Sequence, residues 1–404
     1  MKSGPRVFIT GMGAVSALGL GVSALWHAAR DGRSGVCTLD LPRTANQLVR
    51  QAAHLSDFNA APHFPIETLR TTDRFAQMAL LSAREALADA GWPEGAPLGP
   101  RTAVIIGSGI GGASTSDIEH YKFYQTHERA DPMTIPKVMP NAAASHVSMA
   151  HGAQGLTLAV SSACSSANQA IGLGMMLLRQ GLADRAIVGG SECLITPATF
   201  RAWETLRVMT QGLCRPFSAG RDGMVLGEGA GLLVLETEAA AQARHARPHA
   251  ELAGYGTTSD AGDIVRPNAD GAARAMETAL ADAGLQPSDI HYVNAHGTGT
   301  VLNDRAESEA MWRVFGPDLG CIAVSSTKPV HGHALGAAGA LEMVVTVCAM
   351  RDGVAPPTIN WTGPEKNCIP DPVPNMSRSL PIAAAMSNSF AFGGINASLV
   401  IRKA

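Results

Sequence analysis

One cysteine of this chain stands between a strand-like segment and a helix-like segment. Cys164 follows the apolar run Leu156–Val160, and small or apolar residues then recur with helical spacing from Ala167 to Leu178. A thiol at such a turn faces unpaired backbone N–H groups and the positive end of the helix dipole, which are expected to lower its pKa. A thiolate accepts acyl groups from thioesters readily, because one thioester replaces another. We therefore predict that Cys164 is a nucleophile, and that the other six cysteines are buried structural residues.

Two histidines occupy similar positions in the second half of the chain. His296 and His333 each follow a strand-like run and stand beside glycine-rich sequence; these runs are Ile290–Asn294 and Ile322–Ser325. A lone histidine is more often a satisfied core residue than a catalyst. Ligands of α/β sheets gather beyond the carboxyl ends of strands, so we expect both histidines to share a site with the cysteine. The nearby His331 is expected to be structural.

The glycines behind His296 permit a tight loop that carries two hydroxyl groups. Thr298 and Thr300 are expected to be exposed on this loop, and the acids Asp304 and Glu307 are expected to order it.

Two further segments contribute candidate residues. Lys328 lies in apolar sequence and needs an acid partner, for which Glu342 is the candidate. The segment Asn388–Asn396 is expected to be a glycine-rich turn between two short strands, where Phe392 covers a pocket.

The positions of these residues require a large α/β scaffold. A chain of 404 residues exceeds the size of a single hydrophobic core, so two halves are expected. Strand-like runs alternate with helical patterns such as Arg74–Ala90 and Ala272–Ala283, which indicates layered α/β architecture. Ser162–Gly190 and His331–Asp352 share a pattern of strand end, reactive residue and Gly/Ala-rich helix. We predict two related halves, residues 1–249 and residues 250–404.

Composition restricts the classes of function. The net charge of −3 gives no electrostatic case for nucleic-acid binding. The small-apolar segments are interrupted too often by polar residues to span a bilayer. The seven cysteines form no CxxC pair, and the N-terminal sequence runs directly into an apolar strand without a visible targeting segment. A cytoplasmic protein with reduced thiols is expected.

Two other enzyme classes are alternatives to an enzyme with a cysteine nucleophile. Gly107–Gly112 matches GxGxxG after a strand, which suggests dinucleotide binding, but the following residues do not open an apolar helix and no acid ends a second strand at the expected distance. A serine hydrolase is disfavoured because the sequence has no GxSxG elbow.

Taken together, four motifs resemble those of the elongating β-ketoacyl-[acyl carrier protein] synthases, the type II condensing enzymes of the thiolase superfamily. The resemblance extends along the whole chain and includes Arg215–Ala230. The motifs are SACSS around Cys164, NAHGTGT from Asn294, KPVHGHALGAAG from Lys328 and NSFAFGG from Asn388. Thiolases are disfavoured because they carry a second cysteine where this chain has HGHALGAAG, and starter-type ketosynthases because they use asparagine in place of His333.

The resemblance implies a thiolase-like, five-layered α-β-α-β-α fold and a decarboxylative Claisen condensation. Cys164 would carry the acyl chain, and His296 and His333 would assist decarboxylation of the malonyl thioester. Backbone N–H groups of Cys164 and Phe392 would form the oxyanion hole, with Phe392 as a gate. The residues given supporting roles are Lys328, Glu342, Phe390 and Asp304, and those expected to contact phosphopantetheine are Thr298 and Thr300.

The resemblance also implies partners. Phosphopantetheine would arrive on an acyl carrier protein, with no other cofactor and no required metal, although a monovalent cation near the site is known in some relatives. The residues expected to hold it are Asn294, Glu342, Ser387 and Asn388. The carrier would dock on a thinned basic surface of Arg70, Arg74 and Arg207. A homodimer is expected, with a heterodimer containing a ketosynthase-like subunit as the alternative.

Two segments differ from housekeeping fatty-acid enzymes. Asp263–Pro267 and Ala202–Thr210 are similar to those of nodulation-type and aryl-polyene ketosynthases, which implies an unusual, often polyunsaturated acyl chain. The alternative from another class is a chain-length-factor partner without condensing activity. Such subunits usually lose the nucleophilic cysteine, which this chain retains.

Overall fold

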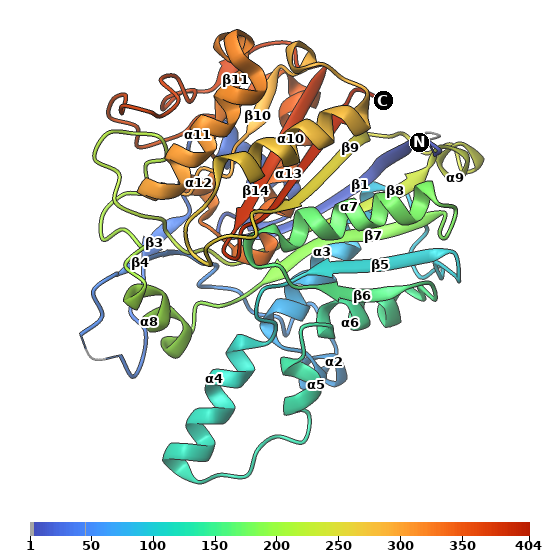
Figure 1. Cartoon of the computed structure of the whole chain (residues 1–404). Helices are drawn as coiled ribbons and strands as arrows, with labels where there is room; N and C mark the ends of the chain where they lie inside the picture. Colours follow the sequence, from blue (N-terminus) through green and yellow to red (C-terminus); the bar gives the residue numbers. More distant parts are fainter. Residues whose placement is uncertain (1–3, 45) are drawn as a thin grey trace.

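Ten strands form one continuous path whose two halves mirror each other. The computed structural model describes residues 4–44 and 46–404 (Figure 1). The strands of the first half, from the centre outwards, are β1 (Val7–Ser16), β8 (Gly229–Thr237), β7 (Arg185–Glu192), β5 (Thr102–Gly107) and β6 (Thr157–Val160). The corresponding strands of the second half are β9 (Ala250–Ser259), β15 (Ile395–Arg402), β14 (Ala384–Ala391), β10 (Tyr292–Asn294) and β11 (Ala323–Ser325).

The pairing pattern is the same on both sides of the centre. The outer three strands of each half run parallel, and the inner pairs run antiparallel. The halves meet where β1 pairs with β9 at only two positions, Phe8 with Glu251 and Ile9 with Ala250. This mirror order supports the proposed division into residues 1–249 and 250–404, since β9 begins at Ala250.

Most strands are buried on both faces, which explains their continuous apolar sequences. The strand-like runs Leu156–Val160, Ile290–Asn294 and Ile322–Ser325 agree with β6, β10 and β11 to within two residues. The expected half boundary near Ala250 is a ten-residue strand, β9. The expected turn at Asn388 was wrong in extent: Asn388 to Ala391 lie within β14, and the turn itself comprises only residues 392–394.

Helices complete five layers, α-β-α-β-α, as expected. Two buried helices, α7 (Ser166–Arg179) and α13 (Ala338–Asp352), lie between the sheet halves, and each contacts strands of both halves. The outer layers are α3 (Arg74–Asp89) with α6 (Ala142–His151) on one side and α10 (Ala269–Ala283) with α11 (Val301–Phe315) on the other. The central helices pack closely: a Cβ on Gly339 would lie 2.3 Å from Oδ1 of Asn168, so only glycine fits there.

Shorter elements surround this body. In Figure 1, α4 and α5 form an arm that projects from the lower edge. The remaining helices are α1 (Val22–Asp31), α2 (Ile66–Thr71), α4 (Ala113–Tyr121), the π-helix η1 (Lys122–Thr126), α5 (Thr134–Val138), α8 (Pro197–Thr205), α9 (Glu238–Ala243) and α12 (Lys328–His331). The minor strands are β2 (Gly19–Leu20), β3 (Val36–Thr38), β4 (Gln51–Ala53), β12 (Val354–Ala355) and β13 (Arg378–Ser379). No helix in the described part of the chain has the length and apolar character needed to cross a membrane.

Candidate active site

Cys164 lies in the turn that joins β6 to α7. The preceding residue, Ala163, has a left-handed φ of 48°, and a single 3-10 turn brings the chain from there into the helix. The hydroxyl of Ser165 donates to the carbonyl oxygens of Ser389 (2.9 Å) and Ile395 (2.7 Å), in the other half of the fold. The turn is therefore held at the junction of the two halves, where Cys164 is only 5% exposed.

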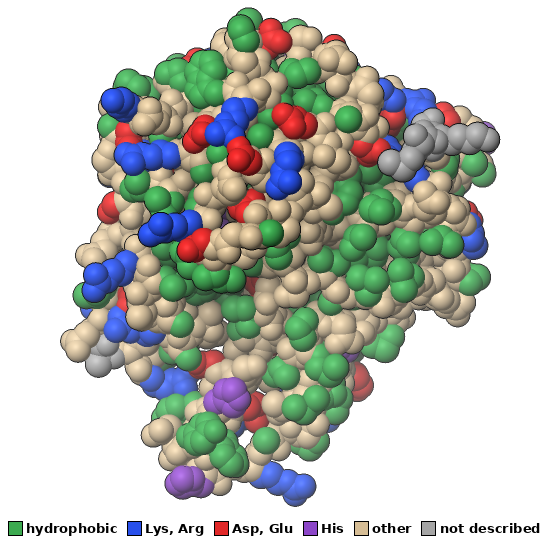
Figure 2. Space-filling model, in the orientation of Figure 1, with side chains coloured by type: hydrophobic (Ala, Val, Ile, Leu, Met, Phe, Trp, Pro, Cys, Tyr) green, Lys and Arg blue, Asp and Glu red, His purple; other side chains and the backbone are tan. Residues whose placement is uncertain are grey.

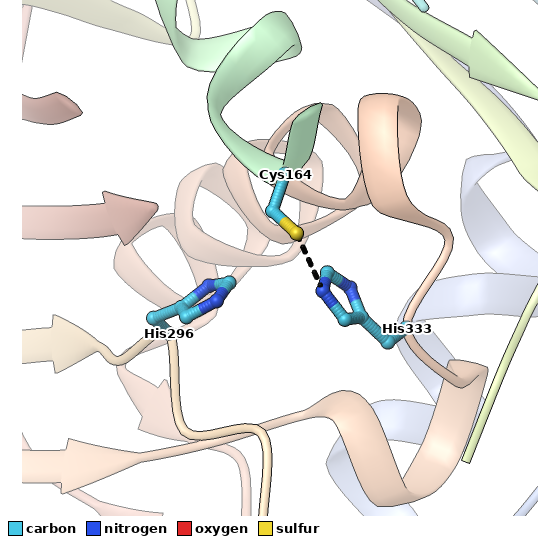
Figure 3. A group of neighbouring side chains, drawn as sticks. All are labelled: Cys164, His296 and His333. Atoms are coloured by element: carbon cyan, nitrogen blue, oxygen red, sulfur yellow. Dashed lines mark hydrogen bonds between the residues drawn. The ribbon is translucent and has the colours of Figure 1, made fainter. Parts of the chain in front are cut away.

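A second turn brings His333 to the thiol. The backbone of His333 donates to the carbonyl of Val225 (2.8 Å) and accepts from Gly227 (2.9 Å), which fixes it beside the segment that precedes β8. A hydrogen bond joins His333 Nε2 to Cys164 Sγ, 3.0 Å apart (Figure 3). The ring of His296 lies 5.3 Å from that of His333 at an angle of 81°. All three side chains point toward one another.

Two buried carboxylates shape the loop that carries His296. The Glu307 carboxylate accepts from the N–H groups of His296 and Gly297, both at 2.7 Å. Asp304 accepts from Gly299 (3.2 Å), so the expected ordering role of both acids is present. We expected this loop to be exposed, but Thr298 is buried against the rest of the chain.

Arg221, for which we predicted no role from the sequence, also supports this loop. Arg221 is buried, pairs with Asp304 at 3.2 Å, and donates to the carbonyl oxygens of Thr300 (3.4 Å) and Val301 (3.2 Å). The position of Arg221 inside the Arg215–Ala230 motif could have indicated this role from the sequence.

The expected ion pair between Lys328 and Glu342 is present and fully buried. Burial raises the pKa of Glu342 to about 7, although the ammonium of Lys328 opposes this shift. Lys328 thus lies in the interior, bonded to Glu342, close enough for its charge to act on Cys164, His296 and His333.

Burial also dominates the ionisation of the three central groups. It raises the pKa of the Cys164 thiol to about 12, and the charge of Lys328 offsets this only in part. Burial and then Lys328 hold the pKa of His296 and of His333 well below the usual value. This corrects the expectation of a thiol pKa lowered by the helix terminus: the resting site contains a neutral thiol and neutral imidazoles.

A cavity of about 360 Å³ leads from Cys164 to the surface. Both Thr298 and Thr300 line it, and so do the two histidines. At its mouth the ring of Phe392 stacks on Trp203, with centroids 5.9 Å apart and planes 16° apart. Phe390 packs edge-on against His296, with centroids 6.1 Å apart. Other apolar residues of the mouth are Leu206, Val208, Ile264, Val265 and Leu302.

Comparison with known proteins agrees with this geometry. The family model "Beta-ketoacyl synthase, N-terminal domain" matches residues 5–241, and "Beta-ketoacyl synthase, C-terminal domain" matches residues 249–362. The chain belongs to the β-ketoacyl synthase family. It is 42% identical to Nodulation protein E of Rhizobium sp. (strain N33), across 98% of this chain and 99% of the relative. It is 40% identical to 3-oxoacyl-[acyl-carrier-protein] synthase 2 of Staphylococcus aureus (strain COL), across 100% and 99%.

A solved structure described as the ishigamide ketosynthase/chain length factor superposes with a TM-score of 0.94. It is 32% identical, and the match covers 99% of this chain and 100% of that one. The fold is therefore thiolase-like, and the chain is an acyltransferase-type ketosynthase.

The arginines expected to dock a carrier differ in their surroundings. Arg207 is exposed and lines the cavity mouth, as does Arg266, which the sequence analysis missed. Arg70 is exposed at the end of α2. Arg74 is only partly exposed, and its guanidinium pairs with the buried carboxylate of Glu228 at 2.6 Å, so it differs from the free surface charge that we expected.

The glycine-rich turn at Gly107–Gly112 is already occupied by a side chain of the ketosynthase. The carboxylate of Glu192 accepts from the N–H groups of Gly109 and Ile110 and from the hydroxyl of Ser108. These donors are therefore not available to a phosphate, which excludes the hypothesis that this turn binds a dinucleotide. Glu192 was not among the residues predicted from the sequence. An acid directly after the run Ala186–Ser191 could have indicated it.

Several side chains have the chemistry to hold a metal. Asn294 Oδ1, Glu342 Oε2 and Ser387 Oγ are buried oxygens that have no hydrogen-bond partner among the residues the structure describes. These fit a monovalent cation. Asn388 does not fit the expected set through its side chain, because its Oδ1 accepts from Ser398 at 2.8 Å.

The candidate catalytic residues themselves form a second group of possible metal ligands. The donors of Cys164, His296 and His333 lie within 4.8 Å of one another, a set that zinc also accepts.

The remaining cysteines of the ketosynthase are not all buried. All seven are free thiols, and Cys37 and Cys321 are exposed, contrary to our expectation. Labelling experiments must therefore resolve individual cysteines.

Proposed function

We propose that Cys164 receives an acyl chain from an acyl carrier protein and that the chain is then extended with a malonyl-derived unit. In the first step, Cys164 Sγ attacks the acyl thioester, and its proton passes through His333 Nε2 to the departing carrier thiol. The single observation that carries this proposal is the hydrogen bond of 3.0 Å between Cys164 and His333, at the end of a cavity open to the surface.

In the second step, the malonyl thioester loses CO₂, and the resulting enolate attacks the acyl group. The Cys164–carbonyl bond breaks, and the thiolate takes up a proton from solvent. Neutral imidazoles of His296 and His333 can donate N–H hydrogen bonds to the enolate oxygen as its charge develops. The lowered pKa of both histidines supports this role, because it keeps them neutral.

Backbone groups and hydroxyls complete the proposed machinery. We assign the oxyanion hole to the N–H groups of Cys164 and Phe392, and contact with the phosphopantetheine arm to Thr298 and Thr300. The support is that all four residues line the same cavity. Lys328 and Glu342 would act through their ion pair, Phe390 through its contact with His296, and Asp304 through Gly299 of the His296 loop.

The phosphopantetheine would be supplied by the carrier, and the enzyme would need no other organic cofactor. A monovalent cation held by Asn294, Glu342 and Ser387 would neutralise charge in the interior and position β10 against α13. We place the enzyme in the cytoplasm, in keeping with its free thiols. We infer carrier docking at Arg207 and Arg266, next to the cavity mouth, with Arg70 as a more distant contributor.

A second copy of the chain is the proposed subunit partner. Strand β6 is the last strand of the path, and its four residues are only partly buried. Figure 2 shows hydrophobic side chains and few charges on the face over β6 and α7, where Leu156, Met176 and Leu182 are exposed. The alternative is a heterodimer with a ketosynthase-like subunit. The intact Cys164–His333 pair favours a catalytic role for this chain over that of a chain length factor.

Mass spectrometry of the acylated protein tests the proposal. The wild-type enzyme, given a panel of acyl-carrier thioesters, should gain one acyl group on Cys164, and the preferred chain should distinguish ordinary from polyunsaturated substrates. Cys164→Ala should form no acyl-enzyme and no condensation product. Cys348→Ala, which removes a buried thiol in α13, is the matched control and should retain both. Condensation by Cys164→Ala would overturn the assignment.

A further inference from the structure

Glu192 holds a carboxylate in the interior, close to the catalytic turn, without any cation against it among the described residues. It is the last residue of β7, and its side chain is fully buried. Oε2 accepts from the backbone N–H groups of Gly109 and Gly336, the latter at 3.2 Å. Oε1 accepts from the N–H of Ile110 (3.3 Å) and the hydroxyl of Ser108 (3.1 Å). The carboxylate thus joins the turn after β5 to the first turn before α13.

Gly336 occupies the position in the second half that Cys164 occupies in the first. Cys164 follows Ala163, which has a φ of 48°, and Gly336 follows Leu335, which has a φ of 41°. Each of these left-handed residues opens a three-residue 3-10 turn, and each turn leads directly into a central helix, α7 or α13. Since the strand order is mirrored as well, the two turns are related by the internal symmetry of the fold.

This symmetry relates the contact between Gly336 and Glu192 to the proposed oxyanion contact of Cys164. The N–H of Cys164 is proposed to stabilise the oxyanion of the reaction, and the N–H of Gly336 stabilises a carboxylate oxygen of the protein itself. Two backbone N–H groups converging on one oxygen are the geometry of an oxyanion hole. A Cβ on Gly336 would lie 2.5 Å from Gly109 N and 2.6 Å from Glu192 Oε2, so the second turn has no room for a nucleophilic side chain.

We propose that Glu192 is a positioning residue whose carboxylate fills an anion-binding turn, formed by the N–H of Gly336, the counterpart of the Cys164 N–H, together with the N–H of Gly109, and thereby fixes His333 against Cys164. His333 lies only three residues before Gly336, so the anchor acts on the segment that carries the imidazole. The same carboxylate holds Gly109, whose carbonyl accepts from Ser161 at 3.3 Å, three residues before Cys164. Glu192 therefore connects both sides of the Cys164–His333 contact.

The negative charge has a second effect that permits a separate measurement. Burial is the main cause of the raised pKa of the Cys164 thiol, and the carboxylates of Glu342 and, to a smaller extent, Glu192 also raise it. Glu192→Gln removes this charge and replaces one acceptor with an amide donor facing backbone N–H groups. Glu192→Asp keeps the charge but draws the carboxylate back by one methylene group.

The test compares these two variants with Glu85→Gln. Glu85 also accepts from two backbone N–H groups, those of Ala14 and Val22, but lies in α3 away from the site. Both Glu192 variants should lose at least tenfold in kcat for condensation, while Glu85→Gln stays within twofold of wild type. The pH profile of Cys164 alkylation should shift to lower pH in Glu192→Gln and remain in place in Glu192→Asp, a distinction that a purely structural role would not produce.

Retention of kcat within twofold by either folded Glu192 variant would overturn the inference. If only Glu192→Asp gives folded protein, its kcat alone decides. The inference rests on the proposed role of Cys164, but the two fail differently. Condensation by Cys164→Ala would refute the proposed function, whereas normal condensation by the Glu192 variants would refute only the positioning role.

Discussion

Cys164 Sγ and His333 Nε2 lie 3.0 Å apart, and both groups are neutral in the resting enzyme. Burial raises the pKa of the thiol and lowers that of the imidazole, so a preformed thiolate–imidazolium pair is disfavoured from both sides. The nucleophile is instead activated when substrate arrives and the proton can move on to the leaving thiol. We therefore expect the resting thiol to alkylate and oxidise slowly, because both reactions require the thiolate.

The first prediction concerns the reactivity of this thiol. With a pKa of about 12, Cys164 should be alkylated by iodoacetamide more slowly at pH 8 than the exposed Cys37 and Cys321. Its rate should rise about tenfold per pH unit up to pH 10, because the thiolate fraction does so below the pKa. Peptide-resolved mass spectrometry of a time course measures each cysteine separately. A plateau below pH 9 would show that the enzyme holds a preformed thiolate.

The second prediction separates the two histidines. His333 contacts the thiol and His296 does not, so His333→Ala should slow acylation of Cys164 by about 10²-fold, the lower range for loss of a proton-transfer group. His296→Ala should acylate within a few-fold of wild type but lose malonyl decarboxylation. Single-turnover acylation and CO₂ release measure the two steps.

His331→Gln is the control for these substitutions. The imidazole of His331 bonds Thr327 and the carbonyl of Gly332, away from the thiol, and an amide can replace those contacts. Both rates should stay within threefold of wild type. Equal loss of acylation in the His296 and His333 variants would refute the division of roles.

The third prediction concerns the buried ion pair. Lys328→Met leaves the Glu342 carboxylate buried without its cation, which should cost about 3–5 kcal/mol of folding stability. The folded-state pKa of Glu342 already exceeds the unfolded value, and it rises further in this variant. A carboxyl with a raised folded pKa is most stabilising when protonated, so the defect should be small at pH 5 and grow as the pH rises above about 7.

The double variant Lys328→Met with Glu342→Gln provides the control. It removes both charges, so thermal unfolding should show most of the lost stability restored and little dependence on pH. Decarboxylation should be lost in both variants, because both remove the ammonium group whose charge acts on His296 and His333. Recovery of activity in the double variant would mean that Lys328 serves stability alone.

The sequence predicted the parts of this site that depend on local pattern. Turn positions for Cys164, His296 and His333 follow from strand ends and glycine-rich helices, and the structure brings the three together. Lys328 and Glu342 were paired correctly because a buried cation demands an acid within reach. Fold class and mirrored halves likewise follow from repeated patterns along the chain.

Properties that depend on three-dimensional burial were not accessible from sequence. The thiol pKa was predicted in the wrong direction, because the dipole of a helix terminus is local whereas desolvation depends on the whole surrounding fold. Arg74 was expected to be a free surface charge, but it forms an ion pair with Glu228, which is far away in the sequence. Glu192 was missed for the same reason: its partners Gly109 and Gly336 come from opposite halves.

The fourth prediction concerns the stack of Trp203 on Phe392. In this arrangement the cavity is continuous from Cys164 to Thr300, so the stacked ring leaves the substrate path open. Gly393 and Gly394 have φ values of 85° and 67°, a left-handed conformation that glycine adopts without strain in the turn behind Phe392.

Trp203→Ala removes the ring that holds Phe392 in the stacked position. Aromatic pairs contribute about 0.5–1.5 kcal/mol, so the apparent KM for acyl-carrier substrate should rise about two- to tenfold. Steady-state kinetics with Trp203→Phe, which keeps a flat ring, should give a KM within twofold of wild type. Trp312→Ala, an exposed tryptophan on α11, controls for general loss of a large side chain. If Trp203→Phe were as impaired as Trp203→Ala, size or the indole N–H would matter rather than stacking, and the role of the aromatic pair would be refuted.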